Sequence, residues 1–275
     1  MTSAGTSRLK HRCVARAIAR IAEARVLPVK NRDQSSVLDG KRHYSGGALG
    51  TVRELAIEAL FFDYDGVLWD SEVAAVRSWQ ETYAEYGQSL SVDSFFTRLG
   101  TIGGIDLVAE LERLLGTSLD REAVERRRWE RKMELVRELK PRPGVLEYIA
   151  EARRRGLAIA VVSTDDTKWI TTGLTILGLS DAFDFIECAE GDKSRAKPSP
   201  ALYLSALDRL ELSAAEAMAI EDSPNGIHAA KTAGLFCIGY ANAVTRQLDL
   251  SEADVVVESL DDLALSHVLR SAALR

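Results

Sequence analysis

The chain has 275 residues, of which 46% are hydrophobic, and this composition supports one large core or a core with a smaller companion domain. No apolar run approaches the about 18 residues that a membrane-spanning helix requires, so we expect no membrane span. The three cysteines are widely separated and match no metal-ligand spacing. This pattern excludes zinc ribbons and disulfide scaffolds and favours a reducing, cytoplasmic setting.

Residues 1 to 50 differ in charge from the rest of the chain. They contain ten Lys or Arg and three Asp or Glu, whereas the remainder carries 25 and 38. Arg12, Arg16 and Arg20 recur at the spacing of a short basic amphipathic helix, which could contact nucleic acid, an anionic membrane or a partner, or resemble a transit peptide. We interpret residues 1–53 as a basic, poorly ordered extension and expect no nucleic-acid partner.

From residue 54 onward, short apolar runs alternate with helical patterns, which is typical of a parallel sheet covered by helices in a Rossmann-like α/β fold. The expected strands are Ile57–Asp63, Leu157–Ser163, Phe183–Cys188, Ala217–Glu221, Phe236–Tyr240 and Asp254–Glu258. Residues 70–140 look helical and are too long for one crossover. We therefore predict an inserted helical domain at 70–140, with the core formed by 54–69 and 141–275.

Two carboxylates follow the first expected strand. Residues two apart on an extended segment point to the same side, so Asp63 and Asp65 can face one pocket. Like charges this close require a proton or a cation nearby, and a divalent metal is the simplest compensation. A turn that uses Asp65 and Gly66 for local hydrogen bonds explains the same residues when they are taken alone.

A second acidic pair, Glu221 and Asp222, ends the fourth expected strand. Oxygen ligands from two neighbouring strands suit Mg²⁺, because this ion prefers carboxylates and retains several waters. The segment Asp222-Ser223-Pro224 also reads as a helix N-cap with proline in the first turn, and both interpretations can hold together.

Two further segments could serve an anion such as phosphate. Ser163 and Thr164 end the second expected strand, where a hydroxyl and the backbone N–H groups of the next helix could hold phosphoryl oxygens. A simple N-cap role explains Ser163 equally well. Lys197 precedes the rigid Pro198 and a helical pattern, and a lysine so placed can neutralise a carboxylate and a phosphoryl group.

Together these motifs resemble the haloacid dehalogenase superfamily. The segments 63–67, Ser163, 197–198 and 221–223 occur in the order and approximate spacing of its four motifs, over residues 57 to 262. Within the superfamily, the segments 197–203 and 221–226 resemble the β-phosphoglucomutase-like branch, which includes pseudouridine monophosphatase-like enzymes. The insertion resembles the small helical cap of that family.

The resemblance implies a Mg²⁺-dependent phosphatase that forms an aspartyl-phosphate. Asp63 would attack phosphorus, and Asp65 would act as acid and then base. Asp63, the backbone carbonyl of Asp65, Asp222 and Glu221 would hold Mg²⁺. Ser163, the Thr164 N–H and Lys197 would bind phosphoryl oxygens, although Thr164 replaces the Asn that is frequent in this branch.

The cap is expected to select the substrate. The predicted contact loop spans residues 98–104, and we take Thr101, Gly103 and also Gly66, in the first motif, as substrate-binding candidates. A plain helix–helix turn is the alternative for this loop. Four aromatic residues of the insert, Trp79, Tyr83, Tyr86 and Trp129, are expected to form the core of the cap.

The expected activity is hydrolysis of a small phosphorylated metabolite, a sugar phosphate or a nucleotide, by a monomer or a homodimer. A phosphosugar mutase is the first alternative, and a non-catalytic binding member of the family is the second. Hydrolytic dehalogenation is disfavoured because, by the resemblance, dehalogenases lack the second aspartate. Phosphonate hydrolysis is also disfavoured. By the resemblance, that reaction needs a lysine in the cap, and the insert has no lysine before Lys132.

Overall fold

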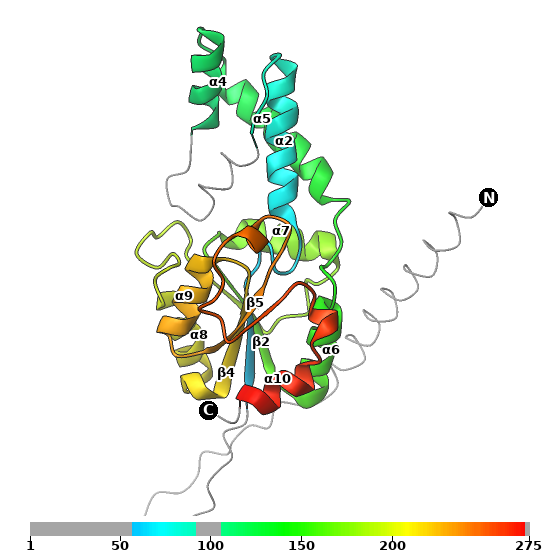
Figure 1. The fold of residues 1–275 in the computed structure, drawn as a ribbon, viewed down its shortest axis with the longest axis vertical. Coiled ribbons are helices and arrows are strands. Elements are labelled where there is room, and N and C mark those ends of the chain that lie inside the picture. The colour runs from blue at the N-terminus through cyan, green and yellow to red at the C-terminus, as the bar shows by residue number, and fades with distance from the viewer. Residues whose placement is uncertain (1–56, 92–105, 273–275) are drawn as a thin grey trace, which may run out of the picture.

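The computed structural model describes residues 57–91 and 106–272 and contains one sheet of six parallel strands (Figure 1). The strands lie in the order β3-β2-β1-β4-β5-β6. All six expected strands are present, each within the predicted range. Their bounds are β1 Ala59–Phe62, β2 Ala158–Ser163, β3 Phe185–Cys188, β4 Ala217–Glu221, β5 Phe236–Tyr240 and β6 Val255–Val257. The Rossmann-like α/β prediction is confirmed.

Helices connect these strands and form the insertion between β1 and β2. Their bounds are α2 Ser71–Glu85, α4 Leu107–Leu115, α5 Arg121–Val136, α6 Val145–Arg155, α7 Thr167–Leu177, α8 Ala201–Leu210, α9 Pro224–Thr232 and α10 Leu265–Ala272. None of the helices in the described ranges is long and apolar enough to cross a bilayer. The predicted basic extension at 1–53 lies wholly outside the described residues.

Alternating side chains of the central strand β1 enter two separate cores. Leu60 and Phe62 belong to the core under α6, α7 and α10, whereas Ala59 and Phe61 belong to the core under α8 and α9. All four residues are fully buried. A central parallel strand is covered on both faces, so the run of apolar residues is what such a strand requires.

The insertion has a small hydrophobic core of its own. Trp79 and Tyr83 of α2 pack with Leu107 and Leu111 of α4 and with Val124 of α5. Figure 1 shows α2, α4 and α5 extending together beyond the end of the sheet. Asp106 and Asp120 cap α4 and α5 by accepting backbone N–H groups, which explains where these two helices begin.

The register of the central strands brings their carboxyl ends together. Phe62 of β1 pairs with Ile220 of β4, and the backbone N–H of Asp63 then donates to the carbonyl of Ile220 at 2.9 Å. The residues that follow these strands therefore lie at one edge of the sheet, where open α/β sheets bind ligands.

Candidate active site

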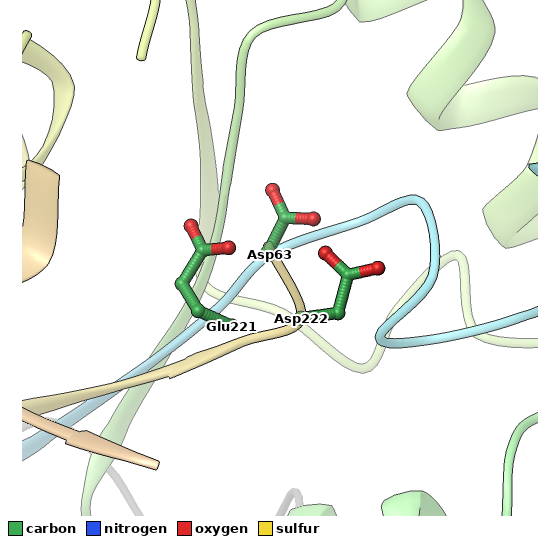
Figure 2. Close-up of side chains that lie close together, drawn as sticks. All are labelled: Asp63, Glu221 and Asp222. Atoms are coloured by element: carbon green, nitrogen blue, oxygen red, sulfur yellow. The ribbon is translucent and has the colours of Figure 1, made fainter. Parts of the chain in front are cut away.

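Three buried carboxylates converge at this edge of the sheet. Asp63 directly follows β1, while Glu221 and Asp222 are consecutive residues at the end of β4. One ligand oxygen from each lies within 4.8 Å of the others. Figure 2 shows the three side chains side by side. The sequence predicted all three as site residues, and the structure brings them together.

Lys197 joins two of these carboxylates. Its Nζ donates to Asp63 Oδ1 at 2.5 Å and to the carbonyl of Val162 at 2.8 Å, and it lies 2.6 Å from Glu221 Oε1. The same Glu221 oxygen accepts the hydroxyl of buried Tyr203 at 2.6 Å. Lys197 reaches this position from the segment that precedes α8, as the sequence predicted.

The cluster has more acidic groups than cationic ones. Burial raises the pKa of Asp63 to about 8, with contributions from the charges of Glu221 and Asp65, although Lys197 opposes the shift. Burial likewise raises the pKa of Asp222, together with the nearby charges of Glu72 and Asp63. Burial lowers the pKa of Lys197, but the charges of Asp63 and Glu221 and their hydrogen bonds raise it by more. One lysine is therefore too little positive charge to balance three carboxylates.

A divalent cation fits this deficit. All three side chains offer the hard oxygen ligands that Mg²⁺ prefers. Glu221 Oε2 is buried and has no hydrogen-bond partner among the described residues. A buried carboxylate oxygen without a partner is costly unless an ion or a water compensates it. Asp63, Glu221 and Asp222 are thus the residues that would hold a metal ion here.

Asp65 lies beside this cluster but is oriented differently. Its Oδ1 accepts the Ser71 hydroxyl, and its Oδ2 accepts Trp169 Nε1 at 2.9 Å. The carboxylate of Asp65 lines a cavity between α2, α5 and the start of α7. Its side chain is therefore separate from the three-carboxylate cluster, and a metal contact through its backbone carbonyl stays a prediction.

Ser163 and Thr164 lie at the end of β2 next to Lys197. The Ser163 Oγ accepts the Asp165 N–H at 3.2 Å, and the Thr164 Oγ1 accepts the Lys197 N–H at 3.2 Å. The alternative that Ser163 caps the next helix is wrong, because α7 begins at Thr167 and Asp166 is its N-cap. In contrast, Ser223 does cap α9, with Pro224 in the first turn.

Two site residues were missed by the sequence analysis. Arg142 is buried, donates to the carbonyls of Gly66 and Ala241, and lies 3.2 Å from Asp70. Asn242 donates from Nδ2 to Asp222 Oδ2 at 2.6 Å. Asn242 follows β5, the neighbour of β4, so a polar residue at that strand end was a usable signal. Arg142 carried no comparable signal.

Gly66 allows the turn after β1 to approach Asp222. It has a positive φ of 77°, and a Cβ at this position would lie 2.0 Å from Asp222 Oδ2 and 2.8 Å from Asn242 Nδ2. Gly87 also has a positive φ, but a Cβ there would meet nothing within 4 Å. A substitution at Gly87 therefore adds backbone strain alone, whereas one at Gly66 adds strain and a steric conflict with Asp222.

We expect Gly66→Ala to destabilise the protein more than Gly87→Ala does. Both changes add the strain of a left-handed non-glycine residue, about 1–2 kcal/mol, but only Gly66→Ala also displaces Asp222. Urea denaturation of both variants measures the difference, and catalytic turnover should fall only for Gly66→Ala. Equal losses of stability would mean that the close approach to Asp222 has no energetic weight.

The predicted cap residues are only partly within the described structure. Thr101 and Gly103, with the whole 98–104 loop, lie outside the described residues. Trp79 and Tyr83 form the core of the insertion, as predicted, and Tyr86 packs against it. The prediction for Trp129 is wrong, because its side chain is exposed and its ring lies 5.7 Å from Trp169 of α7.

Comparisons with known proteins agree with this geometry. Residues 57–234 match the model of the haloacid dehalogenase-like hydrolases. The Bacillus subtilis protein YhcW, named as a phosphatase, is 37% identical over 78% of this chain and 96% of its own. Hexitol phosphatase B of Escherichia coli is 32% identical over 80% and 100% of the two chains.

A solved structure extends the likeness to three dimensions. CbbY from Rhodobacter sphaeroides, in complex with phosphate, is similar to this chain with a TM-score of 0.63 and 32% identity, covering 77% of this chain and 98% of that one. The family model spans more than half of the sequence, and the relatives are covered almost completely. The chain therefore belongs to the haloacid dehalogenase-like hydrolases and is an enzyme of the phosphoric monoester hydrolase type.

Proposed function

We propose that this protein is a Mg²⁺-dependent phosphatase that hydrolyses a small phosphomonoester, a sugar phosphate or a nucleotide, through a phosphorylated Asp63. The observation that carries the proposal is the position of Lys197. Its ammonium group contacts both Asp63 and Glu221 at the sheet edge that also holds Asp222. A nucleophilic carboxylate, a fixed cation and a cation-binding acidic pair are the parts that phosphoryl transfer requires.

The residues take separate roles in this proposal. Asp63 attacks phosphorus in line and the ester oxygen leaves with the bonding electrons. Asp65 protonates that oxygen and then removes a proton from the water that hydrolyses the aspartyl-phosphate. Lys197, Ser163 and the Thr164 N–H bind the phosphoryl oxygens. Asp63, Glu221 and Asp222 would hold Mg²⁺, which when bound would neutralise negative charge on the phosphoryl group.

We propose further that residues 70–140 act as a cap domain over this site, in a cytoplasmic enzyme. The separate core of α2, α4 and α5 supports a distinct unit. Trp129 of this unit contacts Trp169 of the core domain, which supports packing of the unit against the core domain. A cap so placed shields the reacting groups from bulk water.

A direct assay tests the proposed activity and separates it from mutase chemistry. Purified full-length protein with Mg²⁺ should release inorganic phosphate from p-nitrophenyl phosphate and from sugar monophosphates. A phosphosugar mutase would instead interconvert glucose phosphates when primed with a sugar bisphosphate, without net release of phosphate. Interconversion without release, or inactivity toward every phosphomonoester with Mg²⁺ present, would contradict the proposal.

The acidic cluster predicts how stability depends on pH and metal. The pKa of Asp63 is raised from 3.8 to about 8, so the folded state holds this proton more tightly than the unfolded state. Without metal, stability is therefore expected to fall as the pH rises through this window, by up to about 1.4 kcal/mol per pH unit for one proton. Mg²⁺ should offset the loss. Urea denaturation with EDTA and with Mg²⁺ measures both effects, and a flat metal-free profile would contradict them.

A further inference from the structure

A cavity of about 350 Å³ lies on the side of Asp65 that faces the insertion. Its walls include Trp129 and Lys132 of α5, Glu72 of α2, and Trp169 of α7. Asp65 is the proposed acid for the leaving oxygen, so a cavity beside it is where the leaving group of a substrate would lie. The volume is at the lower end of the range for small-ligand sites, about 300–1,000 Å³.

Lys132 is placed in this cavity by aromatic rings and not by an ion pair. Its Nζ lies 3.9 Å from the ring centre of Trp169 and 5.3 Å from that of Trp129. No described residue forms a hydrogen bond or a salt bridge with this ammonium group. Its donors are therefore available to a ligand, while the cation itself is stabilised by the ring faces.

Glu72 offers the complementary group. Its Oε2 is buried and has no hydrogen-bond partner among the described residues. Asp65 and Asp165 line the same cavity, so the described walls carry more acidic than basic side chains. This excess of acidic groups disfavours a second anionic group on a ligand.

The aromatic walls also restrict the shape of the ligand. Trp169 donates its Nε1 proton to Asp65 and has Lys132 over its ring, so this face is not open to a stacked base. Trp129 is 43% exposed and offers an apolar surface to carbon-bound hydrogens. Hydroxyl groups both donate and accept, and they are the groups that satisfy Glu72 and Lys132 together.

We propose that the leaving group of the substrate is a polyol without a second anionic group, a sugar or sugar alcohol, whose carbon chain contacts Trp129 and whose hydroxyls bind Lys132 and Glu72. Substrates with a second phosphate, a carboxylate or a nucleobase are rejected. This inference rests on the proposed phosphatase activity. Glu72, Trp129 and Lys132 are the residues that determine specificity, and they take no part in the attack on phosphorus.

Matched substrates test the proposal on the full-length protein with Mg²⁺. Sorbitol 6-phosphate and gluconate 6-phosphate have the same carbon chain and differ in one terminal group, a hydroxyl or a carboxylate. We expect kcat/KM to favour sorbitol 6-phosphate by about tenfold or more, because the carboxylate meets uncompensated acidic side chains. Adenosine monophosphate should be a poorer substrate than sorbitol 6-phosphate.

Variants assign the preference to individual residues. Burial raises the pKa of Glu72 to about 7, so the assay is run above that pH, where Glu72 is ionised. There Glu72→Gln should reduce the ratio between the two substrates by about threefold or more, because it removes one repelling charge. Glu130→Gln, which changes an exposed residue of α5 outside the cavity, should leave the ratio unchanged. Lys132→Met should lower kcat/KM for sorbitol 6-phosphate by about tenfold, and urea denaturation shows whether the variant is folded. A folded Lys132→Met variant with unchanged kcat/KM would overturn the role of Lys132.

The outcomes that overturn the inference differ from those that overturn the phosphatase proposal. Equal or better use of gluconate 6-phosphate or adenosine monophosphate, with p-nitrophenyl phosphate hydrolysed normally, overturns the polyol assignment alone. Hydrolysis of p-nitrophenyl phosphate without hydrolysis of sorbitol 6-phosphate does the same. A wild-type protein that hydrolyses none of these esters overturns the proposed activity and the polyol assignment together.

Discussion

Asp63→Asn is expected to reduce phosphate release by on the order of 10⁴-fold or more, because an amide cannot serve as the attacking carboxylate. The change preserves the size of the side chain and relieves charge repulsion in the three-carboxylate cluster. The folded state should therefore persist, and in the absence of metal its free energy of unfolding should not fall. The measurements are initial rates of phosphate release at saturating Mg²⁺ and urea denaturation in EDTA.

Asp208→Asn is the matched control for this change. Asp208 is an exposed residue of α8, so the same chemical substitution there should leave turnover and stability unchanged. An Asp63→Asn variant that retains wild-type turnover, with identity checked by mass spectrometry, would exclude Asp63 as the nucleophile. If Asp63→Asn also fails to fold, Asp63→Glu provides a second test. This variant keeps the carboxylate but moves it by one methylene group, so it should fold and still lose turnover.

Lys197→Met is expected to have the largest combined effect on stability and activity. Removing one partner of a buried ion pair leaves Asp63 and Glu221 without their cation, which typically costs about 3–5 kcal/mol. Loss of a preorganised group that stabilises transition-state charge lowers turnover by about 10²–10³-fold. Urea denaturation and steady-state rates measure the two effects separately.

Two further measurements make the Lys197 prediction specific. Lys193→Met changes an exposed lysine on the preceding turn and should alter neither quantity. Mg²⁺ should recover part of the stability lost by Lys197→Met, because it supplies positive charge to the same carboxylates. A Lys197→Met variant as active and as stable as the wild type would show that the contacts of Lys197 with Asp63 and Glu221 have no functional weight.

The fold was predictable because its signals are local. Each buried strand is a short apolar run, and the motif residues stand where the runs end. Parallel pairing then places the ends of neighbouring strands together without further information, which is why Asp63 and Asp222 could be expected at one site. Lys197 follows no strand end, and its role was expected from its place before Pro198 and from the family resemblance. Ser223 was assigned correctly as a helix cap because that role also depends only on adjacent residues.

The parts that were missed depend on contacts between distant segments. Arg142 acts through the carbonyls of Gly66 and Ala241, and no spacing rule connects these three positions. Trp129 was expected in the core of the cap, whereas its ring contacts Trp169 of α7, which lies far away in the sequence. Lys132 lies late in the insertion, yet α5 places it beside Trp169 of the core domain. Its late position in the sequence is therefore not an argument against phosphonate hydrolysis.

Chemical trapping of the phosphorylated enzyme tests the covalent role of Asp63 most directly. Protein quenched in acid during turnover of its best substrate, and then reduced with borohydride, converts an aspartyl-phosphate into homoserine. Peptide mass spectrometry should find homoserine at position 63 only when Mg²⁺ and substrate are both present, and never in Asp63→Asn. Homoserine at a different aspartate, or a phosphorylated histidine or serine with residue 63 unmodified, would contradict the mechanism.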